Sequence, residues 1–457
     1  MRTLVAGLRG PARRDQAPLP RGATEMRLLE ALDLDGCPVC RVIDGADDRH
    51  LFWFLHENFA KSGYPKSWTE SLGFCSGHGE ALLGREGARL RIATTHRALL
   101  RQRRAHWQRE ASSPRADARS DVSSCPVCAT QIRAAREAAS TLLVLLRQPD
   151  VEGRCRERAC LCLPHLRLMA PDLGRDLLER LLLARERAAA QALTPEATLR
   201  LVAGDSPAVP LMPGPAAGAP PSRLSDPTRT LLRDLEGAMA CPVCLNMRRA
   251  WLDWLEETGT GEARAELPLC SGHLWSAVQA AGPASARRLS ARSLEAARSC
   301  AQAALHELAA AAPASGLMRR IWGARLPEKA PALDALMGEA ACVLCQWLET
   351  AQSGTLLRLF DLLQEAKGRA AFERGYGLCV RHAASALALR PSQRVRACLW
   401  EIEDARLAAL EREVAEFTRK SNWHARHEPM GAEASAPERA LRRFSGFLCA
   451  PLLTSSG

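Results

Sequence analysis

Apolar residues recur at helical spacing along most of the chain. Residues 25–34 place Met26, Leu29 and Leu32 on one face of a helix, and residues 47–60 form an amphipathic segment. Longer helices are predicted over 79–110, 174–192, 284–311 and 393–419, and shorter apolar helical segments over 142–146, 251–255 and 356–363. No convincing stretch alternates β-branched and polar residues, as a half-buried strand would. The predicted fold class is all-α.

The last long helix carries an apolar stripe whose period is close to 3.5 residues. Its members are Val395, Leu399, Ile402, Leu410, Val414 and Phe417. Such a stripe is more typical of the core of a helical bundle than of a dimer seam, although a coiled-coil contact is an alternative.

Cysteine and histidine repeat in register with these helices. A Cys-x-x-Cys motif is followed, after a helical stretch, by a Cys-x-x-His motif, and this happens four times. The sixteen residues are Cys37, Cys40, Cys75 and His78; Cys125, Cys128, Cys162 and His165; Cys241, Cys244, Cys270 and His273; and Cys342, Cys345, Cys379 and His382. Three thiolates and one imidazole make a closed tetrahedral set for zinc. Four structural zinc ions are therefore predicted.

The spacing within each motif has a physical reason. Residues i and i+3 lie on the same side of a helical turn, and a proline after the first cysteine suits the first position of a helix. Cysteines that merely pack as small apolar residues would not repeat their spacing with histidine. We expect each Cys-x-x-Cys to pair with the next Cys-x-x-His, although exchange between neighbouring units is also compatible with the sequence. In the second unit, Cys160 is an alternative ligand to Cys162, which alone has a histidine three residues on.

The repeat and the composition divide the chain. A flexible basic arm is expected at 1–24, zinc-helical units at 25–111, 112–202, 229–313 and 314–420, and a C-terminal tail at 421–457. Residues 203–228 are rich in Pro, Gly and Ala and read as a linker. The simplest architecture is two similar halves, each with two zinc units, joined by that linker.

The tail departs from the repeat. His424 and His427 lie three apart beside Glu428, but a fifth metal site would need a ligand that is not evident. A polar segment docked onto the second half through Trp423 is the favoured interpretation. The paired motifs, together with Trp423–Glu433 of this tail, resemble an uncharacterised family of bacterial proteins known only as a domain of unknown function. That resemblance supports zinc and helices and implies no activity.

Composition and charge add alternatives. The net charge is +11, and only five of the 62 basic residues are lysines. A solvated Arg/Glu helix surface is preferred over a nucleic-acid face, for which Arg97, Arg101, Arg103, Arg104 and Arg109 would be the candidates. Arg41 and Arg381 stand beside ligands and could balance anionic zinc sites. No signal peptide or membrane span is visible, so the seventeen cysteines read as metal ligands in a reducing cytoplasm.

The sequence as a whole predicts a non-catalytic zinc-binding helical scaffold that interacts with another macromolecule, most simply a protein. Closed sites leave no position for substrate, and no Gly-rich phosphate loop, His-Glu-x-x-His or serine nucleophile motif is present. A nucleic-acid-binding zinc protein is one alternative. A redox-sensitive switch or chaperone that releases zinc on oxidation is another. An iron–sulfur cluster in place of zinc is a further alternative, because ligand type alone does not exclude iron, but it is less favoured.

Overall fold

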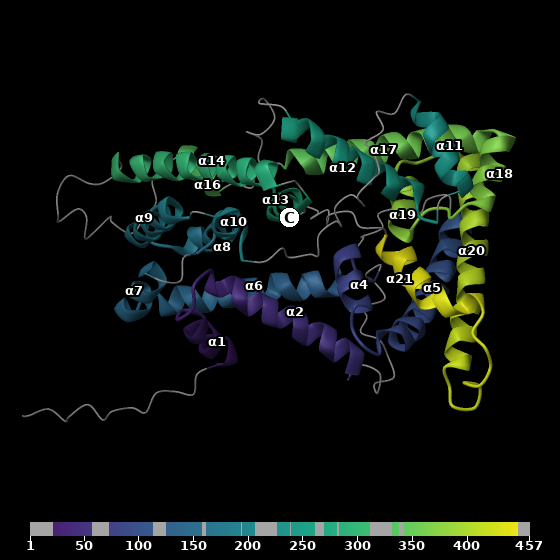
Figure 1. The fold of residues 1–457 in the computed structure, drawn as a ribbon, viewed down its shortest axis with the longest axis horizontal. Helices are drawn as coiled ribbons and strands as arrows, with labels where there is room; N and C mark the ends of the chain where they lie inside the picture. Colours follow the sequence, from purple (N-terminus) through teal and green to yellow (C-terminus); the bar gives the residue numbers. More distant parts are fainter. Residues whose placement is uncertain are drawn as a thin grey trace, which may run out of the picture.

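The computed structural model of this chain is entirely helical over the residues it describes, which are 22–56, 73–112, 125–157, 161–192, 194–205, 226–237, 239–260, 269–280, 283–310, 331–337 and 342–446 (Figure 1). The helices before the predicted linker are α1 (Ala23–Ala31), α2 (Pro38–His56), α4 (Ser76–Leu83), α5 (Ala88–Ser112), α6 (Pro126–Leu145), α7 (Pro149–Glu157), α8 (Leu163–Met169), the short 3-10 helix η1 (Ala170–Asp172), α9 (Arg175–Gln191) and α10 (Pro195–Ala203). The later helices are α11 (Pro227–Gly237), α12 (Pro242–Thr260), α13 (Ser271–Ala280), α14 (Pro283–Ala310), α16 (Pro331–Met337), α17 (Val343–Gln364), α18 (Ala366–Arg374), α19 (Val380–Ala388), α20 (Gln393–Lys420), η2 (Ala432–Ser435) and α21 (Ala436–Ser445). The all-α prediction is confirmed for these residues.

Most predicted helices lie where the apolar spacing placed them. The helices expected at 174–192, 284–311 and 393–419 are α9, α14 and α20. The single helix expected over 79–110 is wrong, because the chain breaks between α4 and α5. Gly87 adopts φ +72°, a conformation that an L side chain rarely takes, so the helix cannot continue through it.

Two antiparallel helix pairs form the centre of the fold. α2 packs along α6. Gln131 of α6 donates a hydrogen bond to Asp47 of α2, and the Thr130 hydroxyl of α6 is hydrogen-bonded to Nδ1 of His50 of α2 at 3.0 Å. α12 packs along α17 in the same way, where Asn246 donates to Thr355 at 2.7 Å and Trp347 donates to the carbonyl of Ala250 at 3.1 Å. In each pair the second helix runs back toward the start of the first.

Helices from the two sides of the predicted linker pack on each other. α20 lies along α5, and α14 contacts α9; α21 contacts α4 and α5, and α10 contacts α13 and α14. Figure 1 shows α5, α20 and α21 side by side, although they come from opposite ends of the sequence. Both large clusters of buried apolar residues contain members from before and after the linker. The apolar stripe of α20 is buried in one of them, which confirms that it belongs to the core of a bundle.

A buried ionic network joins α20, α21 and the segment before α19. Glu403 on α20 and Arg443 on α21 form an ion pair in which both side chains are at most 4% exposed. Glu403 also accepts hydrogen bonds from Arg406 at 3.0 Å and from the backbone N–H of Leu378 at 2.9 Å. Arg443 donates to the carbonyl of Tyr376 at 2.6 Å. The network therefore fixes residues 376–378, which lead directly into Cys379.

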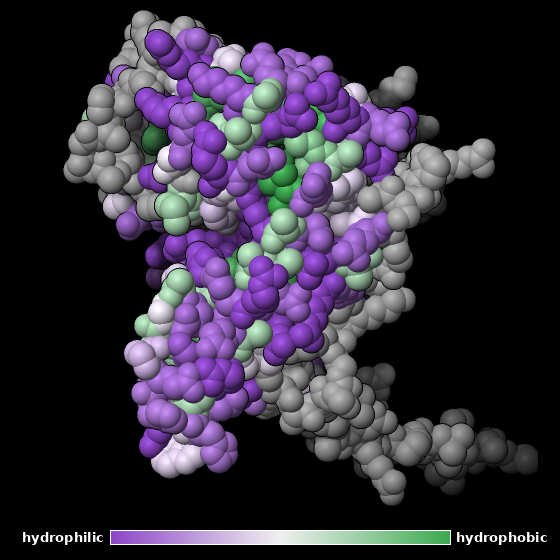
Figure 2. Space-filling model, turned by 90° about the vertical axis from the view of Figure 1, so that its right-hand side faces the viewer, coloured by the Kyte–Doolittle hydropathy of each residue, from purple (hydrophilic) through white to green (hydrophobic). Residues whose placement is uncertain are grey.

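No described helix combines the length and the apolar character that crossing a bilayer would require. The face in Figure 2 is mostly hydrophilic, and its apolar residues show as short patches between polar ones.

Neutralising Glu403 should destabilise the fold strongly. Glu403→Gln leaves Arg443 buried without its counter-charge, and breaking a buried ion pair in this way typically costs about 3–5 kcal/mol. Urea unfolding followed by circular dichroism would measure the change. The matched control is Glu416→Gln on the same helix, whose partner Arg419 is about half exposed and which should leave the urea midpoint unchanged. Equal midpoints for the two variants would contradict the structural role of the network.

Candidate metal centres

All eight cysteine motifs occupy the same local position, at the start of a helix. Helices α2, α4, α6, α8, α12, α13, α17 and α19 each begin at the residue after the first cysteine of a motif. In every motif the carbonyl of that cysteine accepts the first helical hydrogen bond, from the N–H four residues later, at 2.9–3.3 Å. The second ligand, cysteine or histidine, then lies in the first turn on the same side as the first ligand. A proline after the cysteine in three of the four Cys-x-x-Cys motifs suits this position.

An apolar residue precedes each Cys-x-x-His motif and anchors it. Phe74 and Leu378 are buried in one apolar cluster, against which Leu269 packs partly buried, and Leu161 is buried in the other cluster. A packed residue just before a helix fixes the angle at which the chain enters it, which here sets the direction of the cysteine and histidine side chains. The sequence has an apolar residue before all four Cys-x-x-His motifs, but the spacing of the ligands alone does not reveal its role.

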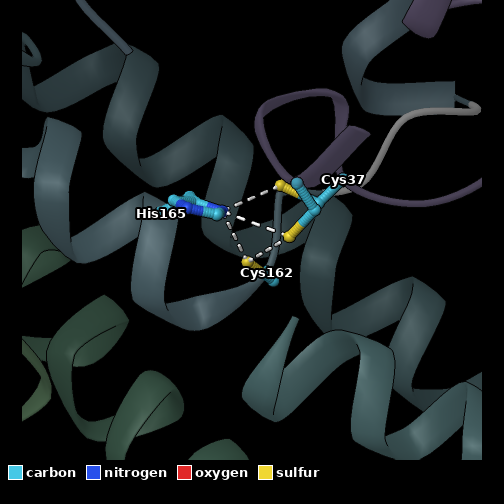
Figure 3. A group of neighbouring side chains, drawn as sticks. Cys37, Cys162 and His165 are labelled. Carbon is cyan, nitrogen blue, oxygen red and sulfur yellow. Dashed lines mark hydrogen bonds between the residues drawn. The ribbon is translucent and has the colours of Figure 1, made fainter. Parts of the chain in front are cut away.

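The structure gathers the sixteen predicted residues into four groups of three cysteines and one histidine. Within each group the potential ligand atoms all lie within 4.8 Å of one another. Site A contains Cys37, Cys40, Cys162 and His165; site B contains Cys75, His78, Cys125 and Cys128; site C contains Cys241, Cys244, Cys379 and His382; and site D contains Cys270, His273, Cys342 and Cys345. Figure 3 shows the side chains of Cys37, Cys162 and His165 in site A turned toward a common centre.

The expected pairing of each Cys-x-x-Cys with the next Cys-x-x-His is wrong. The Cys-x-x-Cys of the first unit meets the Cys-x-x-His of the second in site A, and the two remaining motifs meet in site B. The third and fourth units exchange motifs in the same way to form sites C and D. The cause is the antiparallel pairing of α2 with α6 and of α12 with α17. The start of α6 lies beside the middle of α2, so its cysteines are remote from the start of α2 and meet α4 instead.

The spacing of the ligand atoms fits a tetrahedral zinc ion. With Zn–S near 2.3 Å and Zn–N near 2.0–2.1 Å, a regular tetrahedron has S···S edges of about 3.8 Å and S···N edges of about 3.5 Å. Sulfur–sulfur distances are 3.7 Å in site A, 3.8 Å in site B, 3.9 Å in site C and 4.0 Å in site D. Sulfur–nitrogen distances run from 3.1 to 3.5 Å, always to Nδ1 of the histidine. Each group of four residues could therefore hold one zinc ion.

Acidic residues that are not themselves members of the four groups contact some of the ligand residues and orient them. The Nε2 atom of His78 faces the carboxylate of Asp47 at 3.5 Å, an arrangement that fixes the ring and leaves Nδ1 for a metal. In site A the carboxylate of Asp205 accepts a hydrogen bond from the backbone N–H of Cys37 at 2.7 Å, and the backbone N–H of Asp205 donates to the Cys40 sulfur at 3.4 Å. These acidic residues were not identified from sequence, because nothing in the motif spacing points to them.

Two glycines end the helices that cover sites A and C. Gly204 follows α10 with φ +97°, and a Cβ there would lie 3.1 Å from the Cys40 sulfur. Gly446 follows α21 with φ +77°, and a Cβ there would lie 3.5 Å and 3.6 Å from the sulfurs of Cys244 and Cys379. Gly204 and Asp205 were assigned to the linker from composition. They are instead packed on site A, and Gly204 also accepts a hydrogen bond from the indole of Trp275.

The electrostatics of the sites favour a cation. Burial would raise the pKa of Cys37 and of Cys125, but hydrogen bonds from the other cysteines of each site lower it well below the usual thiol value. Burial would lower the pKa of His78, but its contacts with Asp47, Cys125 and Cys75 raise it to about 12. Hydrogen bonds among the same cysteines raise the pKa of Cys40 and of Cys128 above the usual thiol value, so a bound cation would be needed for all three thiols of site A or site B to lose their protons. Two helix N-termini also converge on each site, and their dipoles favour a net negative centre such as a Zn²⁺ with three thiolates.

Cysteines outside the four groups have other surroundings. Cys155 is buried in the apolar core, Cys300 is exposed, and Cys398 is partly buried. Cys160 and Cys449 lie outside the described residues, while Cys162 is the cysteine that stands in site A. Arg41 donates to the carbonyl of Asp35, and Arg381 donates to the carbonyl of Phe74 at 3.2 Å, next to Cys75 of site B. Among the described residues, no metal-capable group includes His424 or His427.

Trp423 does not dock as expected. Its side chain is 69% exposed, and the Arg426 guanidinium lies 3.4 Å from its ring centroid. The prediction that Trp423 anchors the tail to the second half is therefore wrong.

No family model, characterised protein or solved structure is detectably similar to this chain. The assignment of the sites rests on their own geometry.

Double variants distinguish the observed pairing from the one expected between neighbouring motifs. Cys40→Ser with Cys162→Ser removes two ligands from site A alone, so three of four metal ions should remain. Cys40→Ser with Cys75→Ser removes one ligand from each of sites A and B, so two should remain. Native mass spectrometry counts the bound ions. The opposite order, two ions in the first variant and three in the second, would contradict the crossed pairing.

Proposed function

We propose that this chain is a non-catalytic scaffold in which four structural zinc ions hold a set of helices together, and that the scaffold binds a protein partner. The main support for this proposal is that each of the four groups supplies four protein ligands at a spacing that fits zinc. A catalytic zinc site normally has three protein ligands and an open position for water or substrate. Sites A to D leave no such position when an ion is bound. Because the thiols must stay reduced, we place the protein in a reducing compartment such as the cytoplasm.

The location of the sites supports a structural role. Each one joins the starts of two helices that are remote in sequence, such as α2 and α8 in site A. Structural zinc contributes apparent binding free energies of about 10–16 kcal/mol to folding at neutral pH. Each such contribution is comparable to the stability of whole domains, which is about 5–15 kcal/mol. The metal would therefore decide whether these helices hold together.

We further infer that the chain is a duplicated module whose two copies pack through equivalent faces. The motif order is the same before and after the linker, and corresponding helices occupy corresponding places: α5 and α14, α9 and α20, and α10 and α21. The contacts between copies are reciprocal. The packing of α9 on α14 is matched by that of α20 on α5, and the packing of α10 on α13 and α14 is matched by that of α21 on α4 and α5. Reciprocity of this kind is what a two-fold symmetric interface produces.

The contacts of the arginines on α5 favour a protein partner over nucleic acid. Arg104 forms ion pairs with Asp404 and Glu411 of α20, and Arg101 pairs with Glu411. Arg103 stacks on Trp107, which is buried. Acidic side chains of α20 thus already neutralise Arg101 and Arg104, which weakens the case that these arginines bind phosphates.

Purified protein should contain four zinc ions per chain. Elemental analysis measures the count, and a strong chelator should remove the ions with a large loss of helical circular dichroism, because each ion ties two helices together. Fewer than two ions per chain, or full helicity after metal removal, would contradict the proposal. An absorption band near 400 nm after anaerobic purification would indicate an iron–sulfur cluster instead.

Dividing the chain within the linker tests the duplicated arrangement. Residues 1–213 and 214–457, expressed together as two fragments, should copurify as a heterodimer with four zinc ions, because the contacts of α5 with α20 and of α9 with α14 do not need a covalent connection. Gel filtration with elemental analysis measures this. Fragments that elute separately, each with two zinc ions, would show that the interface between copies is not needed.

A further inference from the structure

The turn between α20 and η2, residues 421–431, projects beyond the end of α20, away from the four metal sites (Figure 1). We call it the Trp423 turn. Its exposed residues include Trp423, at 69%, and Met430, at 44%. Tryptophan is over-represented among the residues that dominate binding energy at interfaces, so an exposed tryptophan on a folded support is a candidate contact.

The metal sites do not require this turn. In the first copy, α9 ends at Gln191 and α10 begins at Pro195, so three residues connect them. In the second copy, α20 extends to Lys420 and fifteen residues, 421–435, separate it from α21. Yet α10 and α21 end alike, each with a positive-φ glycine against cysteine sulfurs. The first copy thus shows that a short connection suffices to place this glycine at a site, so the extra length in the second copy is not needed for that.

The Trp423 turn is held rigidly from its base. Arg419 pairs with both Glu416 and Glu428, which ties the end of α20 to the far side of the turn. Lys420 donates to the carbonyl of Pro429 at 2.9 Å and to Glu433 at 2.7 Å, and Glu433 also accepts from the backbone N–H of Gly431 at 2.8 Å. Preorganisation of this kind lowers the entropy lost on binding.

Backbone hydrogen bonds and one buried residue complete the base. The N–H of Ala425 donates to the carbonyl of Asn422 at 3.1 Å, and the N–H of Glu428 donates to the carbonyl of Ala425 at 3.0 Å. The side chain of Ala425 is buried, although its neighbours on both sides are exposed. The turn therefore presents Trp423 from a folded support.

Of the two charged residues in the turn, Arg426 is exposed and Glu428 is partly buried. Glu428 pairs with Arg419, and Glu433 pairs with Lys420. Arg426 stacks on one face of the Trp423 indole, and His424 and His427 are exposed beside it. Arg426 forms no ion pair among the described residues, so its positive charge is available to a partner. An acidic surface complements this arrangement.

We propose that the Trp423 turn is the contact by which the scaffold binds its protein partner, and that the partner offers an apolar pocket for the indole with carboxylates at its rim. The indole N–H needs an acceptor when it is buried, which a rim carboxylate can supply. Arg426 would then lie between the indole and the acidic rim. This inference rests on the proposed scaffold function and names the surface that performs it. Tryptophan and arginine are the residues most enriched among those that dominate binding energy at interfaces.

Site-specific photocrosslinking in the native cell tests the surface directly. A benzophenone amino acid is placed at position 423 of the full chain and, as a matched control, at position 357, where Leu357 is also exposed (53%) but lies on α17. Mass spectrometry identifies any adduct specific to position 423 and maps the crosslinked residues. The expected result is one protein, attached within an apolar pocket that carries Asp or Glu at its edge. Adducts only with lipid, nucleic acid or a second copy of this chain, or none above the control, would overturn the proposal.

Binding of the identified protein to the purified full chain gives the second measurement. Trp423→Ala should weaken binding roughly 30-fold or more, as loss of a dominant interface residue does. Arg426→Glu should also weaken it, and raising the salt concentration should weaken the wild-type complex. Leu357→Ala should bind as wild type, and all variants should retain four zinc ions. Unchanged affinity in Trp423→Ala would overturn this inference while leaving the zinc scaffold intact, whereas a chain without zinc would overturn the scaffold itself.

Discussion

The meeting of two helix N-termini at three sulfurs and one imidazole nitrogen, seen four times, is the feature on which the proposed scaffold depends. Each Cys-x-x-Cys or Cys-x-x-His motif uses one turn of helix to direct two ligand atoms to one side. A metal ion then requires two such turns to face each other within a few ångströms. Four of these junctions fix α2, α4, α6 and α8, and then α12, α13, α17 and α19, relative to one another. The long helices α5, α9, α14 and α20 pack around that framework.

The crossed pairing has a consequence for cooperativity. If neighbouring motifs paired, each unit would close on itself and could fold independently of the next. In the observed arrangement neither the first nor the second unit holds a complete site, so α2, α4, α6 and α8 must assemble together. Reciprocal packing of α20 on α5 and of α14 on α9 extends this dependence across the linker. The described helices thus contact one another across the linker as well as within each half.

The sequence predicted the helical class and the sixteen clustered residues because those signals are local. Apolar spacing reports the buried face of a helix, and ligand spacing of three reports one helical turn. Pairing is not local, since every motif offers the same type of ligands and a Cys-x-x-His from either neighbour satisfies a Cys-x-x-Cys equally well. Only the antiparallel packing of α2 with α6 decides between them. The contact of Gly204 and Asp205 with site A could not be predicted for a similar reason, because it depends on the end of α10 lying on that site. The helix break at Gly87 could have been predicted from the sequence, since Gly84 and Gly87 interrupt the helical pattern there.

Anomalous scattering at the zinc absorption edge from crystals of the purified protein tests the central claim most directly. The account predicts four strong peaks, one at the centre of each crossed group, with three sulfur neighbours at about 2.3 Å and one nitrogen at about 2.0–2.1 Å. Peaks placed between each Cys-x-x-Cys and the Cys-x-x-His that follows it in sequence, or groups without a metal peak, would contradict it.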